Sequence, residues 1–103
     1  MKIAIAADAP NVDTDVAAHA GRAPYYLIFN PDGRLHAAAA NPVAASGQGA
    51  GPAAVQFLAG QGVGLVVAGE FGPHFLDALA AHGIKHALET GRVADVIARL
   101  IAR

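Results

Sequence analysis

VGLVVAG, residues 63–69, decides the fold class of this chain of 103 residues. The run is short, apolar and rich in valine, and Gly69 ends it, as is typical of a strand buried within a sheet. A helical pattern opened by Gly72 and Pro73 follows, and then comes a short run, KHAL at 85–88. A strand, a helix and a second strand in this order indicate a parallel βαβ unit.

Upstream, three further runs predict strands. KIAIAA at 2–7 is apolar enough to be covered on both faces of a sheet. YYLIFN at 25–30 is aromatic and β-branched, and PDG at 31–33 suits a tight turn with a following bulge. RLHAAAA at 34–40 should therefore return antiparallel as a weak edge strand.

Two more helices complete the order of elements. Pro52 should begin one at its first turn, running to about Ala59. Thr90 suits the N-cap of the last helix. The apolar stripe of that helix comprises Val93, Val96, Ile97, Leu100 and Ile101. The order βββαβαβα predicts a single three-layer α/β domain over residues 1–103, with a mixed five-stranded sheet and about three helices.

Composition excludes several classes of function. Seven basic and eight acidic residues give a net charge of −1, so the positive excess that supports nucleic-acid binding is missing. Cysteine is absent, which removes disulfides, thiolate nucleophiles and ordinary cysteine-ligated iron-sulfur sites. The first apolar run is too short for a signal peptide, and no run reaches 18 apolar residues, so we expect a soluble, cytoplasmic protein without a membrane partner.

Three segments should meet at the carboxyl ends of the parallel strands, where open α/β sheets bind ligands. The long connection 8–24 carries His19 and Arg22, the strand at 63–69 is followed by Glu70, and a glycine-rich stretch at 41–52 opens a helix. Helix N-termini in the same place present unpaired amides. The sequence predicts a small, mildly cationic cleft suited to an anion.

His19 is the strongest single candidate, because imidazole is the one soft-to-borderline metal ligand that this chain offers in a loop. A surface or capping role is the alternative. Arg22 could hold an anion, or it could pair with Asp13 or Asp15 across its own loop. His74, at the first turn of a helix that opens on the expected cleft, is the second candidate ligand.

Two alternatives use the same end of the sheet. Asp8 and Glu70 both follow central strands, so their carboxylates could hold Mg²⁺ as in ribonuclease-H-like nucleases. That chemistry needs a further carboxylate and a basic surface, and the sequence offers neither clearly. A metal-free interaction or regulatory module that docks a partner through these loops is the other alternative.

Four blocks of sequence, in order, resemble the dinitrogenase iron-molybdenum cofactor biosynthesis (nitrogenase accessory factor) family. They are MKIAIAAD at 1–8, HAGRAPYYLIF at 19–29, GAGPAAVQFLAGQGV at 49–63 and VVAGEFGPHFLDAL at 66–79. The resemblance implies a ribonuclease-H-like motif with strand order 3-2-1-4-5 and strand 2 antiparallel. Family members commonly have phenylalanine after the histidine, where this chain has Ala20.

The same resemblance implies a non-catalytic role. Such proteins bind, carry or store preformed metal-sulfur clusters, either iron-molybdenum cofactor precursors or, in the small orange proteins, a molybdenum-copper sulfide cluster. It also implies a cluster donor or acceptor protein as partner, and it makes His19 the metal ligand. The residues it places at or around the cluster are His19, Gly21, Arg22, Gly49, Gly51, Gly69, Gly72 and Pro73.

Overall fold

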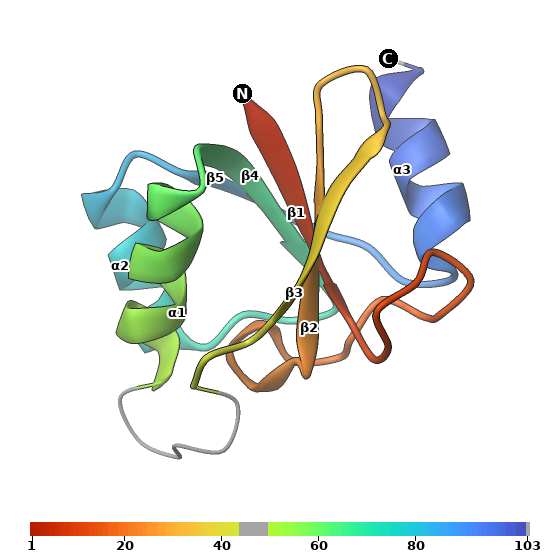
Figure 1. Ribbon diagram of the computed structural model, residues 1–103. Helices are drawn as coiled ribbons and strands as arrows, with labels where there is room; N and C mark the ends of the chain where they lie inside the picture. Colours follow the sequence, from red (N-terminus) through yellow and green to blue (C-terminus); the bar gives the residue numbers. More distant parts are fainter. Residues whose placement is uncertain (44–49, 103) are drawn as a thin grey trace.

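The computed structural model describes residues 1–43 and 50–102, which form a three-layer α/β fold (Figure 1). The elements in chain order are β1 Lys2–Ala7, the 3₁₀ turn η1 Ala20–Arg22, β2 Tyr25–Phe29, β3 Leu35–Ala40, α1 Ala50–Gly60, β4 Val63–Ala68, α2 Pro73–Ala81, β5 Lys85–Leu88 and α3 Val93–Ile101. None of the helices in this described part of the chain is both long and apolar enough to cross a bilayer.

The sheet has the order β3-β2-β1-β4-β5, which confirms the predicted mixed sheet. β1 is central and pairs in parallel with β4, with Ile5 opposite Val67. β2 runs antiparallel to both of its neighbours, β1 and β3. The carboxyl ends of β1 and β4 therefore lie side by side, at the edge where the candidate site was expected.

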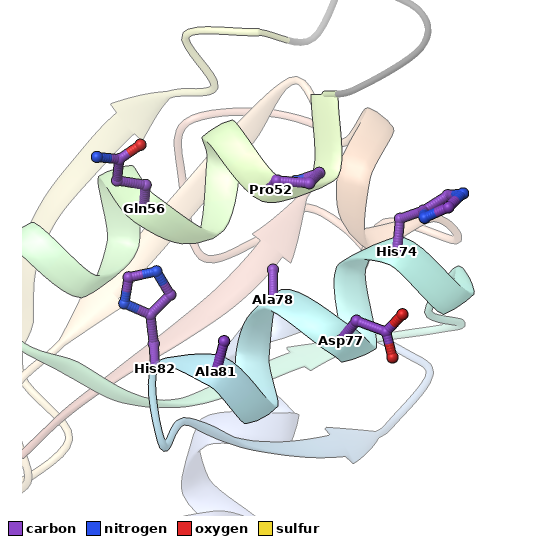
Figure 2. A pocket seen from close by; sticks show the side chains of 7 residues that line it. All are labelled: Pro52, Gln56, His74, Asp77, Ala78, Ala81 and His82. Atoms are coloured by element: carbon purple, nitrogen blue, oxygen red, sulfur yellow. The ribbon is translucent and has the colours of Figure 1, made fainter.

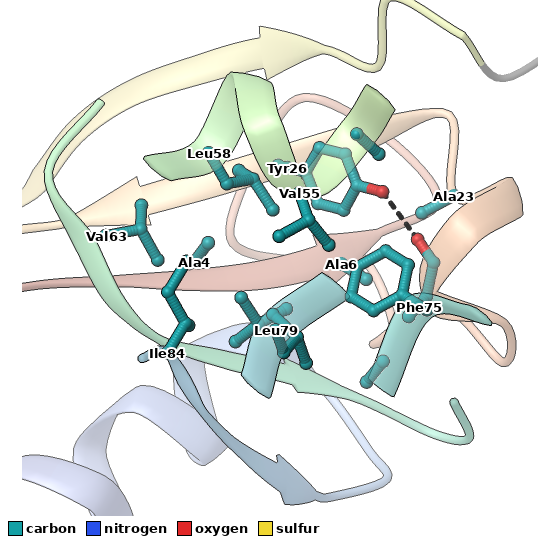
Figure 3. Close-up of a cluster of buried hydrophobic side chains, with 14 of the residues drawn as sticks. Ala4, Ala6, Ala23, Tyr26, Val55, Leu58, Val63, Phe75, Leu79 and Ile84 are labelled. Atoms are coloured by element: carbon teal, nitrogen blue, oxygen red, sulfur yellow. Dashed lines mark hydrogen bonds between the residues drawn. The ribbon is translucent and has the colours of Figure 1, made fainter. Parts of the chain in front are cut away.

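Helices cover both faces of the sheet. α1 and α2 cover one face and α3 covers the other (Figure 1). On β1 the two faces differ in residue size, because Ala4 and Ala6 face α1 and α2 whereas Ile3 and Ile5 face α3. The small alanines leave room for larger side chains, and those buried over them include Tyr26, Val55, Leu58, Phe75 and Leu79 (Figure 3).

The β2–β3 hairpin has the tight turn that PDG predicts. Gly33 adopts a φ of 91° and donates its N–H to the Asn30 carbonyl at 2.9 Å. A positive φ of this kind favours glycine. The register of the two strands shifts between Ile28 and Phe29, so the expected irregularity is also present.

Two helix starts differ from the predicted positions. α1 begins at Ala50, two residues before Pro52. The N-cap of α3 is Arg92 rather than Thr90, and no side chain caps the helix. Backbone groups from a distant loop replace the cap: the N–H of Val93 donates to the Thr14 carbonyl and that of Ala94 to the Val12 carbonyl, each at 2.9 Å.

Candidate functional site

The connection between β1 and β2 is docked onto the end of β4 by backbone hydrogen bonds. Gly69 donates its N–H to the Ala17 carbonyl at 3.0 Å, and the Ala20 N–H donates to the Glu70 carbonyl at 3.0 Å. His19 is extended and forms an isolated parallel bridge with Glu70. This segment, part of the long connection 8–24, thus continues the sheet at the position where the strands end.

The bridge brings two side chains together. Nδ1 of His19 lies 2.9 Å from Oε1 of Glu70, with side chains 55% and 67% exposed. Glu70, expected from the sequence as half of a carboxylate pair with Asp8, is therefore paired with the imidazole instead. Asp8 is exposed, and its N–H donates to the Asp15 carbonyl at 3.4 Å.

A buried polar network holds η1, the turn that follows His19. The Tyr26 hydroxyl donates to the Ala20 carbonyl at 2.6 Å. Nδ2 of Asn41 lies 3.2 Å from the Gly21 carbonyl and 2.9 Å from that of Ala23. These bonds satisfy the carbonyls of the turn, so they hold η1 against the strand that supports it.

Asn41 is the one buried polar or charged residue among those the structure describes, at 7% exposure. Its Oδ1 accepts the N–H of Val43 at 3.1 Å, and its Nδ2 lies 3.3 Å from the Tyr26 hydroxyl. Burial raises the pKa of Tyr26 well above its usual value, so the phenol stays protonated and remains a donor. Sequence reasoning missed this residue; the Asn-Pro pair at 41–42 is a turn signal, but nothing local indicates that its side chain is buried.

Arg22 ends η1 with an exposed side chain. Within residues 1–43 and 50–102, no acidic side chain forms an ion pair with it. Asp13 and Asp15, the two partners that the sequence left open for Arg22, are therefore not paired with it in the described residues, and Arg92 lies 3.6 Å from Asp13. Asp15 is joined to Arg92 by a backbone bridge.

The starts of α1 and α2 approach the same turn. A Cβ added to Gly21 would lie 3.6 Å from the Phe75 ring and 3.9 Å from Cα of Gly51. One added to Gly51 would lie 3.3 Å from the backbone nitrogen of Phe75. The structure therefore brings η1 and both helix starts together, as the predicted cleft requires.

Three more predicted residues lie in or near this region, and one does not belong to the described structure. Gly72 is the extended N-cap of α2 and Pro73 its first residue, both exposed. A Cβ at Gly72 would meet nothing within 4 Å, so packing does not demand glycine there. Gly69 lies against the β1–β2 connection. Gly49 falls outside the described residues.

His74 faces a different surface. A shallow groove of about 440 Å³ runs between α1 and α2, and Figure 2 shows His74 beside Asp77 near one end of it. The residues that line it are Pro52, Gln56, His74, Asp77, Ala78, Ala81 and His82. His19 is not among the residues that line this groove. Over the described ranges, no group of three or more His, Asp or Glu side chains is placed to hold a metal ion.

Substituting Gly69 by alanine should loosen the docked connection. The new Cβ would lie 3.0 Å from the Ala18 carbonyl oxygen and 3.1 Å from its Cα, so backbone must shift. We expect a loss of about 2 kcal/mol in the free energy of unfolding, measured with urea. Gly60→Ala is the control, since its Cβ would meet nothing within 4 Å. Equal stability of the two variants would contradict the close approach.

Comparison with known proteins identifies similar chains. A family model described as dinitrogenase iron-molybdenum cofactor matches residues 1–103. Comparison with curated proteins gives no match. The apo form of the orange protein from Desulfovibrio gigas is 31% identical, with a TM-score of 0.88 over 98% of this chain and 87% of the other.

Two further solved structures are similar. A Thermotoga protein provisionally described as NifB, of the DUF35 family, is 28% identical, with a TM-score of 0.80 over 96% of this chain and 85% of the other. A provisionally described dinitrogenase from Methanocaldococcus jannaschii is 16% identical, with a TM-score of 0.65 over 99% and 88%. At that identity the last similarity establishes the fold alone.

Proposed function

Because this chain belongs to the dinitrogenase iron-molybdenum cofactor family, we propose that it binds a preformed, anionic metal-sulfur cluster without catalysing a reaction on it. One observation carries the proposal: His19 directly precedes, and Arg22 ends, a 3₁₀ turn that a buried network holds in place, and both side chains are exposed. An imidazole and a guanidinium held three residues apart offer a metal ligand and a fixed positive charge to the same cargo.

Each component has a distinct role in this proposal. His19 supplies the one protein ligand to a metal, and Arg22 offsets the negative charge of the cluster. α2 begins beside η1, since a Cβ added to Gly21 would lie 3.6 Å from the Phe75 ring, and the positive end of the helix dipole favours an anion there. A cluster that brings its own sulfides needs few protein ligands, so the absence of cysteine from the chain is no obstacle.

The cargo of the proposal is an iron-molybdenum cofactor precursor or a related molybdenum-iron or molybdenum-copper sulfide. Similarity to the orange protein and to a provisionally described NifB supports this class of cargo. A carrier or store of such a cluster exchanges it with a donor or acceptor protein. The loops at the carboxyl ends of β1 and β4 are then the surface that the exchange partner approaches.

The metal and sulfide content of protein purified without oxygen tests the proposal. We expect molybdenum, iron or copper together with acid-labile sulfide, in fixed ratio to the protein. The same folded protein free of metal and sulfide, and unable to take up a molybdenum sulfide afterwards, would favour a metal-free interaction module instead.

Arg22→Ala should weaken binding through lost charge. The probe is tetrathiomolybdate with copper(I), added without oxygen and followed by its charge-transfer absorbance. We expect about a fivefold rise in Kd, the effect of one exposed charge-assisted contact, and a smaller dependence of Kd on salt. Arg34→Ala is the matched control, because Arg34 lies in the β2–β3 turn near Asp32. Equal losses in the two variants would contradict a specific role for Arg22.

A further inference from the structure

We propose that Glu70 is a positioning residue: its carboxylate holds Nδ1 of His19, so that the imidazole presents Nε2 as the ligand atom for the cluster. The ligand assignment rests on the proposed function. The orientation of the ring is a property of the metal-free protein and can be tested by itself.

The backbone fixes the register of the two residues. His19 and Glu70 are partners in a parallel bridge, and the Ala20 N–H donates to the Glu70 carbonyl at 3.0 Å. Gly69 allows this approach, because a Cβ there would lie 3.0 Å from the Ala18 carbonyl oxygen. Glu70 is therefore held beside His19 by the main chain, whatever its own side chain contributes.

The side-chain geometry then selects one tautomer of the ring. The separation of 2.9 Å between Nδ1 and Oε1 is that of a good N–H···O bond. An ionised carboxylate only accepts, so Nδ1 carries the proton. In the neutral ring the lone pair consequently resides on Nε2. No other hydrogen bond to this ring comes from the described residues.

Stability does not explain the pair. Both side chains are more than half exposed, and exposed ion pairs contribute little to folding. Histidines that bind metals commonly donate their second ring N–H to a carboxylate, which fixes the ring and raises its basicity as a ligand. The contact thus has the form of a support for metal ligation rather than of a structural bridge.

The metal-free protein provides the first test, with ¹⁵N-labelled histidine and NMR at about pH 8, where an ordinary imidazole is neutral. We expect the Nδ1–H tautomer at His19 in the wild type, a shift toward Nε2–H in E70A, and partial rescue in E70Q, whose amide oxygen can still accept. D8N removes a charge at the neighbouring strand end and should leave the tautomer unchanged. The same tautomer in E70A and wild type would overturn the proposal.

Binding provides the second test, with tetrathiomolybdate and copper(I) as the probe. E70A should bind about tenfold more weakly, as is typical when the partner of a ligating histidine is removed, whereas D8N should bind like the wild type. Binding by E70A that matches or exceeds the wild type would overturn the positioning role. Failure of the wild type to bind the probe would contradict the proposed function alone, because the tautomer is measured without metal.

Discussion

Asn41→Ala should lower the free energy of unfolding by about 3 kcal/mol. The carboxamide lies within hydrogen-bond distance of the Gly21 and Ala23 carbonyls and of the Val43 N–H, and the residue is only 7% exposed. Removing it leaves several backbone groups without their partners in a poorly hydrated place. A buried group left unsatisfied costs more than an average hydrogen bond contributes, so the loss should exceed that of an ordinary surface change.

Urea denaturation with an unchanged m-value measures this loss. Asn11→Ala is a matched control, because Oδ1 of Asn11 accepts the N–H of Asp13 at 3.0 Å, the same kind of contact two residues along, but in an exposed loop. We expect a change within about 0.5 kcal/mol there. If Asn41→Ala cost no more than Asn11→Ala, water would be replacing the carboxamide, and the network would not be what holds η1.

Tyr26→Phe addresses the same network from the strand side. It removes the donor to the Ala20 carbonyl, a 2.6 Å bond, while it preserves the ring that packs under α1. Because the Tyr26 hydroxyl also lies 3.3 Å from Nδ2 of Asn41, the double variant should lose less than the sum of the single losses. Strict additivity would show that the two side chains act independently.

Much of the fold could be predicted because its signals are local. Apolar runs such as 63–68 and punctuation by glycine and proline mark strands and turns within a few residues. The start of α3 could not be placed in this way. Thr90 has the chemistry of a cap, but carbonyls of Val12 and Thr14 satisfy the first amides of the helix, and those residues are some 80 positions away in the chain.

The place of the candidate site could be predicted from the order of the strands, but the pairing of its side chains could not. The topology brings the segment around His19 to the end of β4, so the convergence of His19 and Glu70 followed from strand order. Which side chains pair did not follow, because Asp8 and His19 both lie in the connection after β1 and only the backbone register selects His19. Asn41 begins the glycine-rich stretch 41–52, and its burial could not be predicted, since burial of a single polar side chain leaves no periodic pattern.

His19→Ala should have the largest effect on binding of any single substitution in the site. The proposed function gives the cluster one protein ligand. Loss of that ligand should cost at least as much as the largest typical effect of losing an outer-shell partner, so we expect Kd for the molybdenum-copper sulfide probe to rise by about 100-fold. The side chain is 55% exposed, so the variant should retain its stability. His36→Ala is the control, since it removes an exposed imidazole from the edge strand β3.

The central claim, that this chain binds an anionic metal-sulfur cluster through His19, is tested most directly by one anaerobic titration. Wild type, His19→Ala and His36→Ala are titrated with tetrathiomolybdate and copper(I), and bound metal is counted after gel filtration. In the protein fraction after gel filtration, we predict a charge-transfer band and retained molybdenum for the wild type and for His36→Ala, and neither for His19→Ala. Equal retention by all three folded proteins, or none in the wild type, would contradict the account.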